Sequence, residues 1–341
     1  MTRRTLFLMG VAGASGCRRD QRPRLNVFNW SGYIGVDTVS NFEREFGVQV
    51  RYGTYESNEE MFARVATGNS GWDVVFPTCV LIQPMREYQL LAPIEHGKLS
   101  NIGNLDAMFQ RPVWDPDLRW GIPYLWGATG ICYSRSVAEA PTAWEDMWEP
   151  ALQGRMTMLD DQVDVFAACL KKLGYSINTR NPEEIREAHA EAMEQKELLR
   201  AYINADVRDQ LVAGDVLAAQ LWTSTSLMAI DDSRDLAFVY PEEGFPLYLE
   251  MAAVLRESRR RDLAHRFIDY LLRPDVAAGI VRASRAATPN RGARALLEPA
   301  LRDDPTLFPP ADVMTRGEWA LTTPPDIQKL RDRLWTELKS A

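Results

Sequence analysis

The feature that most constrains the fold is the regular alternation of short apolar strands with amphipathic helices in the first part of the chain. Residues 25–29, 48–52 and 73–76 are predicted strands, because they are apolar or alternate apolar with polar side chains. Between them, residues 39–46 repeat apolar side chains at helical spacing, and a second helix begins with Asn58 as its N-cap. This βαβαβ order predicts a parallel sheet with right-handed crossovers, whose ligand lies beyond the carboxyl ends of the strands.

A second α/β unit follows the proline- and tryptophan-rich stretch at residues 123–127. The length of 341 residues fits two domains or one large one, and it is enough to bury a substantial core. Nothing after Cys17 is apolar over the roughly 20 residues that a membrane-spanning helix needs. The predicted strands of the second unit are 130–133, 155–159, 216–222, 236–239 and 248–255, and the remaining predicted helices are 161–173, 182–200, 207–213, 260–272, 275–282 and 327–338.

The chain is acidic and lacks the sequence patterns of common enzymes. Its 39 Lys and Arg residues against 47 Asp and Glu residues give a net charge of −8, which disfavours a nucleic-acid partner and tolerates a cationic one. His96, His189 and His265 lie outside any metal, phosphate-loop, serine-nucleophile or dinucleotide motif, and we interpret them as surface or helix-packing residues. We therefore expect no catalytic residues, no cofactor and no metal; an exported enzyme is the alternative.

The start of the chain has the pattern of an export signal. Two arginines precede a short apolar run at residues 6–14, and small residues lead directly to Cys17. We interpret residues 1–16 as a signal peptide, Cys17 as a lipidation site, and residues 17–24 as a basic tether between the lipid anchor and the fold. The alternative is a cytoplasmic protein with an apolar start.

The other three cysteines, Cys79, Cys132 and Cys169, are an odd number without metal-type spacing. We expect them to be small buried hydrophobic residues. The oxidising environment of an exported protein permits one disulfide among them, but the sequence does not assign it.

Aromatic and acidic residues gather at the predicted strand ends. Those that lie in or shortly after strands are Trp30, Tyr33, Trp222, Tyr248 and Glu250. This combination suits an organic ammonium ion, because carboxylates balance the desolvated charge while aromatic faces cover the methylene groups. The alternative is that the tryptophans belong to the hydrophobic core.

Three further acids, Asp160, Asp161 and Asp164, follow the predicted strand at residues 155–159 and open a helix. They are candidates for binding an ammonium group, but each is also typical of a helix cap, Asp160 above all. A calcium loop is disfavoured, because the spacing lacks the alternating oxygen ligands and the glycine of that motif.

Several blocks of sequence, in order along the chain, resemble one known family. They are NWSGY at residues 29–33, TYESNE at 54–59, IPYLWGAT at 122–129, LLRPDVA at 271–277, TPN at 288–290 and GEW at 317–319. Together they are similar to the periplasmic spermidine/putrescine-binding proteins of ABC importers. The resemblance implies an α/β, two-lobed type II periplasmic binding protein fold with two crossing hinge strands, which closes on its ligand by hinge motion. The implied lobes are 25–128 with 252–293 and 129–251 with 294–341, so that the crossings fall near residues 126–130 and 250–253.

The resemblance also implies a ligand site built from both lobes. Carboxylates would hold ammonium groups, aromatic side chains would cover methylenes, and hydroxyls would form hydrogen bonds. The implied ligand-binding residues are Trp30, Ser31, Tyr33, Thr78, Asp161, Asp164, Trp222, Tyr248 and Glu250. Glu250 replaces a shorter Asp of the family. Larger departures are Gly32 in place of an acid, Val80 and Ala286 in place of tyrosines, and Ala320 in place of a glutamine, which predict one wider and less polar end of the pocket.

We therefore expect a monomeric, lipid-anchored protein on the periplasmic or extracytoplasmic face of the membrane. It would capture a polyamine and deliver it to an ABC transporter permease. Two alternatives stay open: the same fold binding a different organic cation or an amino-acid derivative, and a ligand sensor that signals to a membrane receptor.

Overall fold

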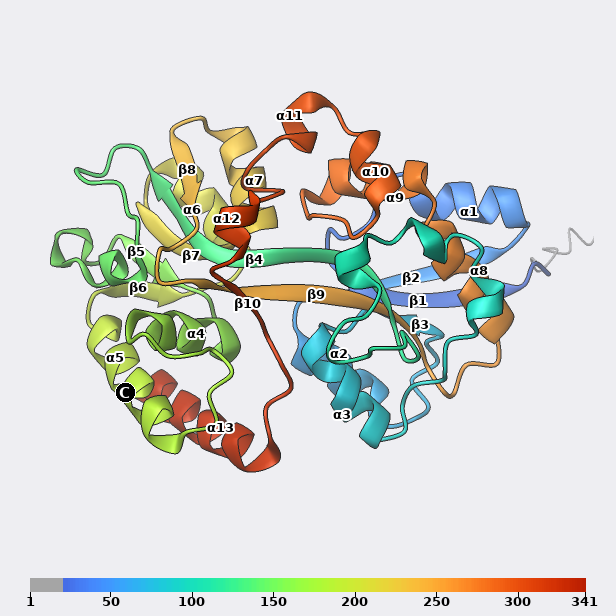
Figure 1. Ribbon diagram of the computed structural model, residues 1–341, viewed down its shortest axis with the longest axis horizontal. Helices are drawn as coiled ribbons and strands as arrows, with labels where there is room; N and C mark the ends of the chain where they lie inside the picture. Colours follow the sequence, from blue (N-terminus) through green and yellow to red (C-terminus); the bar gives the residue numbers. More distant parts are fainter. Residues whose placement is uncertain (1–20) are drawn as a thin grey trace, which may run out of the picture.

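The structure is a computed structural model that describes residues 21–341. The predicted signal peptide at residues 1–16 and the predicted lipidation site Cys17 lie outside the described residues. Within residues 21–341, no helix combines the length and the apolar character needed to cross a membrane. Figure 1 shows two lobes side by side, joined by two long strands, β4 and β9.

The first lobe contains the predicted βαβαβ unit. Its strands β1 (Arg24–Trp30), β2 (Gln49–Tyr55) and β3 (Val74–Val75) are parallel, in the order β2-β1-β3. Helices α1 (Thr38–Phe46) and α2 (Asn58–Val65) connect them. The predicted cap is wrong by one residue: Ser57 is the N-cap of α2, because its backbone is extended and its side chain accepts the Glu60 N–H at 3.1 Å.

Further helices of the first lobe cover the two sides of this sheet, α8 and α9 beside α1, and α3 beside α2 (Figure 1). They are α3 (Ile82–Glu87), α8 (Arg261–Leu271), α9 (Pro274–Ser284) and α10 (Arg291–Ala295). Pro274 separates α8 from α9 and occupies the first turn of α9, where a missing N–H costs no hydrogen bond. The short helices α11 (Pro299–Arg302) and α12 (Ala311–Met314) follow on the way back to the second lobe.

The second lobe is built on the far part of β4 followed by β7, β5 and β6. Its elements are β5 (Met156–Met158), α4 (Gln162–Lys172), α5 (Pro182–Lys196), β6 (Leu199–Tyr202), α6 (Val207–Ala213), β7 (Ala218–Trp222), α7 (Thr223–Asp232), β8 (Leu236–Val239) and α13 (Pro325–Ser340). Neither β6 nor α7 was predicted from the sequence. Residues 199–200 continue the polar pattern of the preceding helix, and α7 begins with four Ser and Thr residues, which favour caps and turns over helix interiors.

Two strands run through both lobes. β4 (Ile122–Ser134) pairs antiparallel with β9 (Phe245–Val254) up to Ala128 and with β7 from Thr129 onward. β9 continues into the first lobe, where it pairs with β3, and β10 (Gly317–Trp319) pairs with its other end. These are the two crossing strands that the resemblance implied, while the exact lobe boundaries remain predictions.

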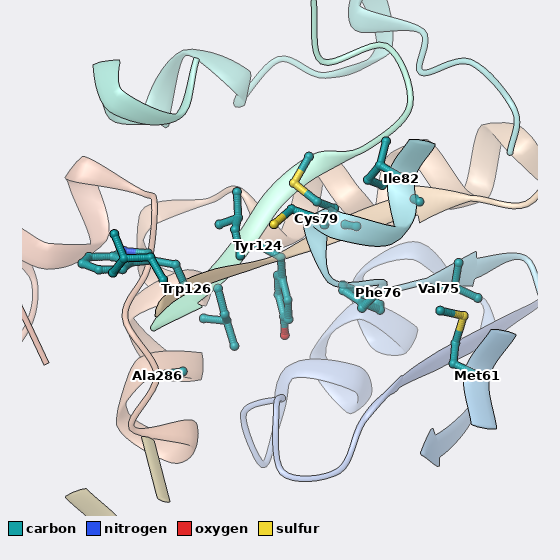
Figure 2. Close-up of a cluster of buried hydrophobic side chains, with 14 of the residues drawn as sticks. Met61, Val75, Phe76, Cys79, Ile82, Tyr124, Trp126 and Ala286 are labelled. Atoms are coloured by element: carbon teal, nitrogen blue, oxygen red, sulfur yellow. The ribbon is translucent and has the colours of Figure 1, made fainter. Parts of the chain in front are cut away.

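The hydrophobic core of the first lobe lies directly beside the crossing strands. Figure 2 shows Phe76 and Cys79, which follow β3, near Tyr124 of β4, with Trp126 of the same strand on the other side of Tyr124. All three cysteines in the described part of the chain are buried free thiols, as expected for small hydrophobic residues. Burial raises the pKa of the Cys79 thiol to about 12, so it stays protonated.

A substitution at Gly130 of β4 tests this arrangement of strands. A Cβ at Gly130 would lie 2.5 Å from Phe238 Cζ and 2.6 Å from the Val239 carbonyl oxygen on the neighbouring strand β8. We expect Gly130→Ala to lower the free energy of unfolding by about 1 to 3 kcal/mol, because a backbone atom must move. Urea unfolding followed by circular dichroism measures this. Gly97→Ala is the control, because no atom would lie within 4 Å of its Cβ; equal losses in the two variants would contradict the strand arrangement.

Candidate functional site

A cavity of about 140 Å³ lies between the lobes, beside the crossing strands. All nine residues predicted to bind a ligand line it, namely Trp30, Ser31, Tyr33, Thr78, Asp161, Asp164, Trp222, Tyr248 and Glu250. The fold explains why residues so distant in sequence meet here. The parallel strands β1, β2 and β3 all end at this edge of the first lobe, and β7 ends at the facing edge of the second.

Glu250 lies at the floor of the cavity, on β9, and is 4% exposed. The Trp30 indole Nε1 donates a hydrogen bond to Glu250 Oε2 at 2.8 Å, and the Thr78 hydroxyl donates to both carboxylate oxygens at 3.1 and 3.2 Å. Burial raises the pKa of Glu250 to about 8, although the hydrogen bonds from Thr78 and Trp30 oppose this shift. Without a cation beside it, this carboxyl group therefore holds its proton near neutral pH.

The Thr78 hydroxyl has a defined orientation. Asn58 Oδ1 accepts the Thr78 backbone N–H at 3.3 Å, which fixes the amide so that Asn58 Nδ2 donates to Thr78 Oγ1 at 3.0 Å. Since the Thr78 oxygen is occupied as an acceptor, its own hydrogen is directed to Glu250. Asn58 also lines the cavity.

Asp161 and Asp164 lie at the N-terminus of α4. Asp161 is the N-cap, and its Oδ1 accepts the backbone N–H groups of Val163 at 2.8 Å and Asp164 at 3.1 Å. The prediction that Asp160 is the typical cap is wrong, because its side chain pairs with Lys339 at 2.7 Å on the surface. Asp161 thus both caps the helix and lines the cavity.

Asp164 is buried in the first turn of α4. Thr129 Oγ1 donates to its Oδ1 at 2.7 Å, and Trp222 Nε1 donates to its Oδ2 at 2.9 Å. Burial raises the pKa of both Asp161 and Asp164, and the charge of Asp164 raises that of Asp161 further. Glu59, on α2 of the opposite lobe, contributes to the shift of Asp161, so acidic groups face each other across the cleft.

The aromatic residues close the cavity around these acids. Tyr33 of the first lobe lies with its hydroxyl 3.3 Å from the Ser224 hydroxyl of the second lobe. Burial, and next the charge of Glu250, raise the pKa of Tyr33 to about 12, so the phenol is neutral. Tyr248 lies against Gly127 of β4, where a Cβ would come within 2.4 Å of the Tyr248 hydroxyl. A glycine is needed at this position of the crossing strand for the ring to fit.

The charge of the cavity has one sign. Among the described residues that line it, the ionisable acids are Glu56, Asp161, Asp164 and Glu250, and none is Lys, Arg or His. No group of three or more His, Cys, Asp and Glu residues within 21–341 is arranged to hold a metal ion. The arrangement is suited to an organic cation, which the aromatic side chains can cover.

Comparison with known proteins agrees with this geometry. Residues 37–309 match the family described as bacterial extracellular solute-binding protein. The chain is 33% identical over 310 residues to the spermidine/putrescine-binding periplasmic protein of Escherichia coli strain K12, which covers 90% of this chain and 89% of that protein. This chain belongs to the bacterial extracellular solute-binding proteins. They are a family of transport proteins and not a family of enzymes.

Solved structures place the solute-binding protein in the type II periplasmic binding fold. A putative spermidine/putrescine ABC transporter protein from Listeria monocytogenes superposes with a TM-score of 0.89 at 27% identity, covering 93% of this chain and 98% of that one. The Tp0655 (TpPotD) lipoprotein of Treponema pallidum superposes with a TM-score of 0.86 at 26% identity, covering 92% and 99%. The predicted fold class is confirmed.

Besides Thr225 of α7, two polar residues of the solute-binding protein's cavity, Glu56 and Asn58, were not predicted as site residues. Glu56 directly follows β2, so the rule that identified Ser31 after β1 and Thr78 after β3 would have found it. Both lie in the TYESNE block that carried the family resemblance.

The four residues that depart from the family pattern lie in different parts of the structure. Val80 and Ala320 line the cavity, and both pack with Ala167 and Ile177 into a small apolar cluster. Ala286 does not line the cavity but is buried in the core shown in Figure 2. Gly32 lies in the turn after β1 with a φ of 73°, a conformation that favours glycine.

The raised pKa of Glu250 predicts how stability depends on pH. A carboxyl group whose folded pKa is about 8 binds its proton more tightly in the folded protein than in the unfolded chain, where its pKa is about 4.3. We therefore expect the ligand-free protein to lose stability as pH rises from about 4.3 through 8, and Glu250→Gln to flatten this decline. Urea unfolding at pH 6 and pH 9 measures the difference. Glu139→Gln, at an exposed glutamate outside the cavity, is the control; parallel curves for all three proteins would contradict the burial argument.

Proposed function

We propose that this solute-binding protein captures a polyamine of the putrescine or spermidine type between its lobes and delivers it to the permease of an ABC transporter. The observation that carries the proposal is the single charge sign of a cavity closed by aromatic rings. Four acids line it without a basic residue among the described lining residues, and Glu250 and Asp164 are buried. The relatives named for spermidine and putrescine binding support the same ligand class.

The physical reason is the cost of a buried carboxylate without a partner. Removing such a group from water is unfavourable unless a cation or hydrogen-bond donors compensate. The raised pKa values of Glu250, Asp161 and Asp164 reflect this cost in the ligand-free protein. A polyamine supplies two or more ammonium groups, each with several N–H donors, joined by methylenes that need no polar partner.

The nine predicted ligand-binding residues have three different roles, according to their chemistry. Asp161, Asp164 and Glu250 pair with ammonium groups, while Ser31, Tyr33 and Thr78 form hydrogen bonds. The aromatic residues Trp30, Trp222 and Tyr248 cover the methylene groups and attract the charge through their ring faces.

We also propose that the protein is held at the membrane surface. Cys17 carries a lipid that anchors the monomer to the extracytoplasmic face of the membrane, with residues 17–24 as tether. The structural similarity to the Tp0655 lipoprotein supports an anchor of this kind. Closure of the lobes brings together a surface that the permease recognises, while the anchor keeps the protein near it.

A second candidate ligand is a bulkier organic cation. The observation that favours it is the apolar wall formed by Val80 and Ala320 at the cavity. An amine with an apolar substituent would fill this part of the site better than a bare ammonium end.

Calorimetry tests the ligand directly. We expect residues 18–341 to bind putrescine or spermidine and not 1,4-butanediol, which has the length of putrescine without its charges. Asp161→Asn with Asp164→Asn should weaken amine binding at least tenfold, about 1.4 kcal/mol, because it removes two carboxylates from the site. The same double substitution at Asp206 and Asp209, outside the cavity lining, is the control. Absence of binding to every polyamine, spermine included, or unchanged affinity of the cavity variant, would contradict the proposal.

Binding should also release protons. In the empty protein the pKa of Glu250 is about 8, so below that pH the carboxyl group is largely protonated, and an ammonium ligand requires its ionised form. Affinity for putrescine should therefore rise from pH 6 to about pH 8. Calorimetry in two buffers of different ionisation enthalpy counts the protons released, and a binding heat that is the same in both buffers would show that the carboxyl groups are already ionised.

A further inference from the structure

The two buried carboxyl groups of the cavity are held in the same way, one in each half of the site. Glu250 accepts an indole N–H from Trp30 and a hydroxyl hydrogen from Thr78. Asp164 accepts an indole N–H from Trp222, and its second donor is the Thr129 hydroxyl at 2.7 Å. The residue that corresponds to Thr78 in this second arrangement is therefore Thr129, which does not itself line the cavity.

Thr129 is placed where the chain passes from one lobe to the other. It is fully buried, and it is the first residue of β4 that pairs with β7, directly opposite Trp222. The preceding residue, Ala128, is the last that pairs with β9. Both donors to Asp164 thus come from adjacent strands at the edge of the second lobe.

The two donors oppose the effect of burial, which raises the pKa of Asp164. An indole N–H can only donate, so the Asp164 Oδ2 lone pair that faces Trp222 carries no proton. A hydroxyl that donates to Oδ1 favours the ionised form of the carboxyl group as well and fixes the rotation of its plane. A third contact holds the backbone, since Gln220 Nε2 donates to the Asp164 carbonyl oxygen at 2.7 Å. The remaining lone pairs of the carboxylate are left for a ligand in the cavity.

We infer that Thr129 is a positioning residue for cation capture: its buried hydroxyl orients the Asp164 carboxyl group and favours its ionised form, which an ammonium group requires. This inference rests on the proposed function, because it concerns the same site. It adds a residue that acts through Asp164 without contacting the ligand, and it makes the crossing strand β4 part of the binding site.

Three substitutions separate this role from simple packing. Thr129→Val keeps the shape of the side chain and removes the hydroxyl, and we expect it to weaken spermidine and putrescine binding about tenfold. Thr129→Ser keeps the hydroxyl and should bind within about twofold of the parent. Thr223→Val is the matched control, because Thr223 is a buried threonine of the same region whose hydroxyl contacts the Ala128 backbone N–H at 3.3 Å and no carboxyl group. It should bind as the parent does.

A double-mutant cycle links the effect to Asp164. Thr129→Val should cause no further loss of affinity in an Asp164→Asn background, because the group that it positions has already lost its charge. Should Thr129→Val fail to fold, as judged by circular dichroism, Thr129→Ala carries the same expectations with less bulk. Additive losses in the cycle, equal affinity of Thr129→Val and the parent, or equal losses in the Val and Ser variants would each overturn the inference.

The outcomes also distinguish this inference from the proposed function. If the parent binds neither spermidine nor putrescine, or if Asp164→Asn binds as the parent does, the amine site itself is contradicted, and the positioning role falls with it. If the parent binds and Asp164→Asn weakens binding while Thr129→Val does not, only the role of Thr129 is contradicted.

Discussion

The structure depends on keeping carboxyl groups in a dry cleft without a cation of the protein's own to pair with them. Ionised groups are expensive to bury, and no Lys, Arg or His appears among the described residues that line the cavity. The chain compensates only partly, with indole and hydroxyl donors to Glu250 and Asp164. The remaining desolvation cost raises the pKa of Asp164 and of Glu250. A cationic ligand would recover this free energy when it binds.

The buried carboxyl groups are connected to the two strands that join the lobes. Glu250 belongs to the crossing strand β9 and is held by Trp30 and Thr78 of the first lobe. Asp164 belongs to the second lobe and is held in part by Thr129 of the crossing strand β4. A rotation of the lobes about β4 and β9 therefore moves the two anionic positions relative to each other. A ligand with charges at both ends has different interaction energies with the open and the closed form, as a ligand must if it is to drive closure.

The sequence predicted the site residues that lie at strand ends. It did not predict residues whose role depends on the direction of a single side chain. Trp30 and Thr78 could be predicted, because apolar periodicity located β1 and β3, and the cavity lies at the carboxyl ends of these strands. The resemblance supplied the roles of Asp161 and Asp164. The full length of β4 could not be predicted, because Ile122–Ser134 is almost wholly buried and so shows no alternation, and it contains proline and glycine. Thr129 ends the IPYLWGAT block that carried the resemblance, but nothing in the sequence indicated a role for its hydroxyl, because that role depends on the Asp164 oxygen to which the hydroxyl donates.

In the proposed amine site, the uncharged part of the cavity would contribute to selection among amines. Coulomb attraction falls slowly with distance and distinguishes poorly between cations of equal charge, whereas apolar contacts depend on close fit. The apolar wall formed by Val80 and Ala320 is itself an interlobe contact, because the Thr322 hydroxyl donates to the Val80 carbonyl oxygen at 2.8 Å across the same junction. A ligand end that is too long would clash with this wall, and a polar end would lose its hydrogen bonds to water against it. Either effect would raise the free energy of the closed form and leave that of the open form unchanged. In the proposed site, charge would thus draw a cation into the cleft, and the fit of its apolar part against this wall would decide whether the lobes stay closed.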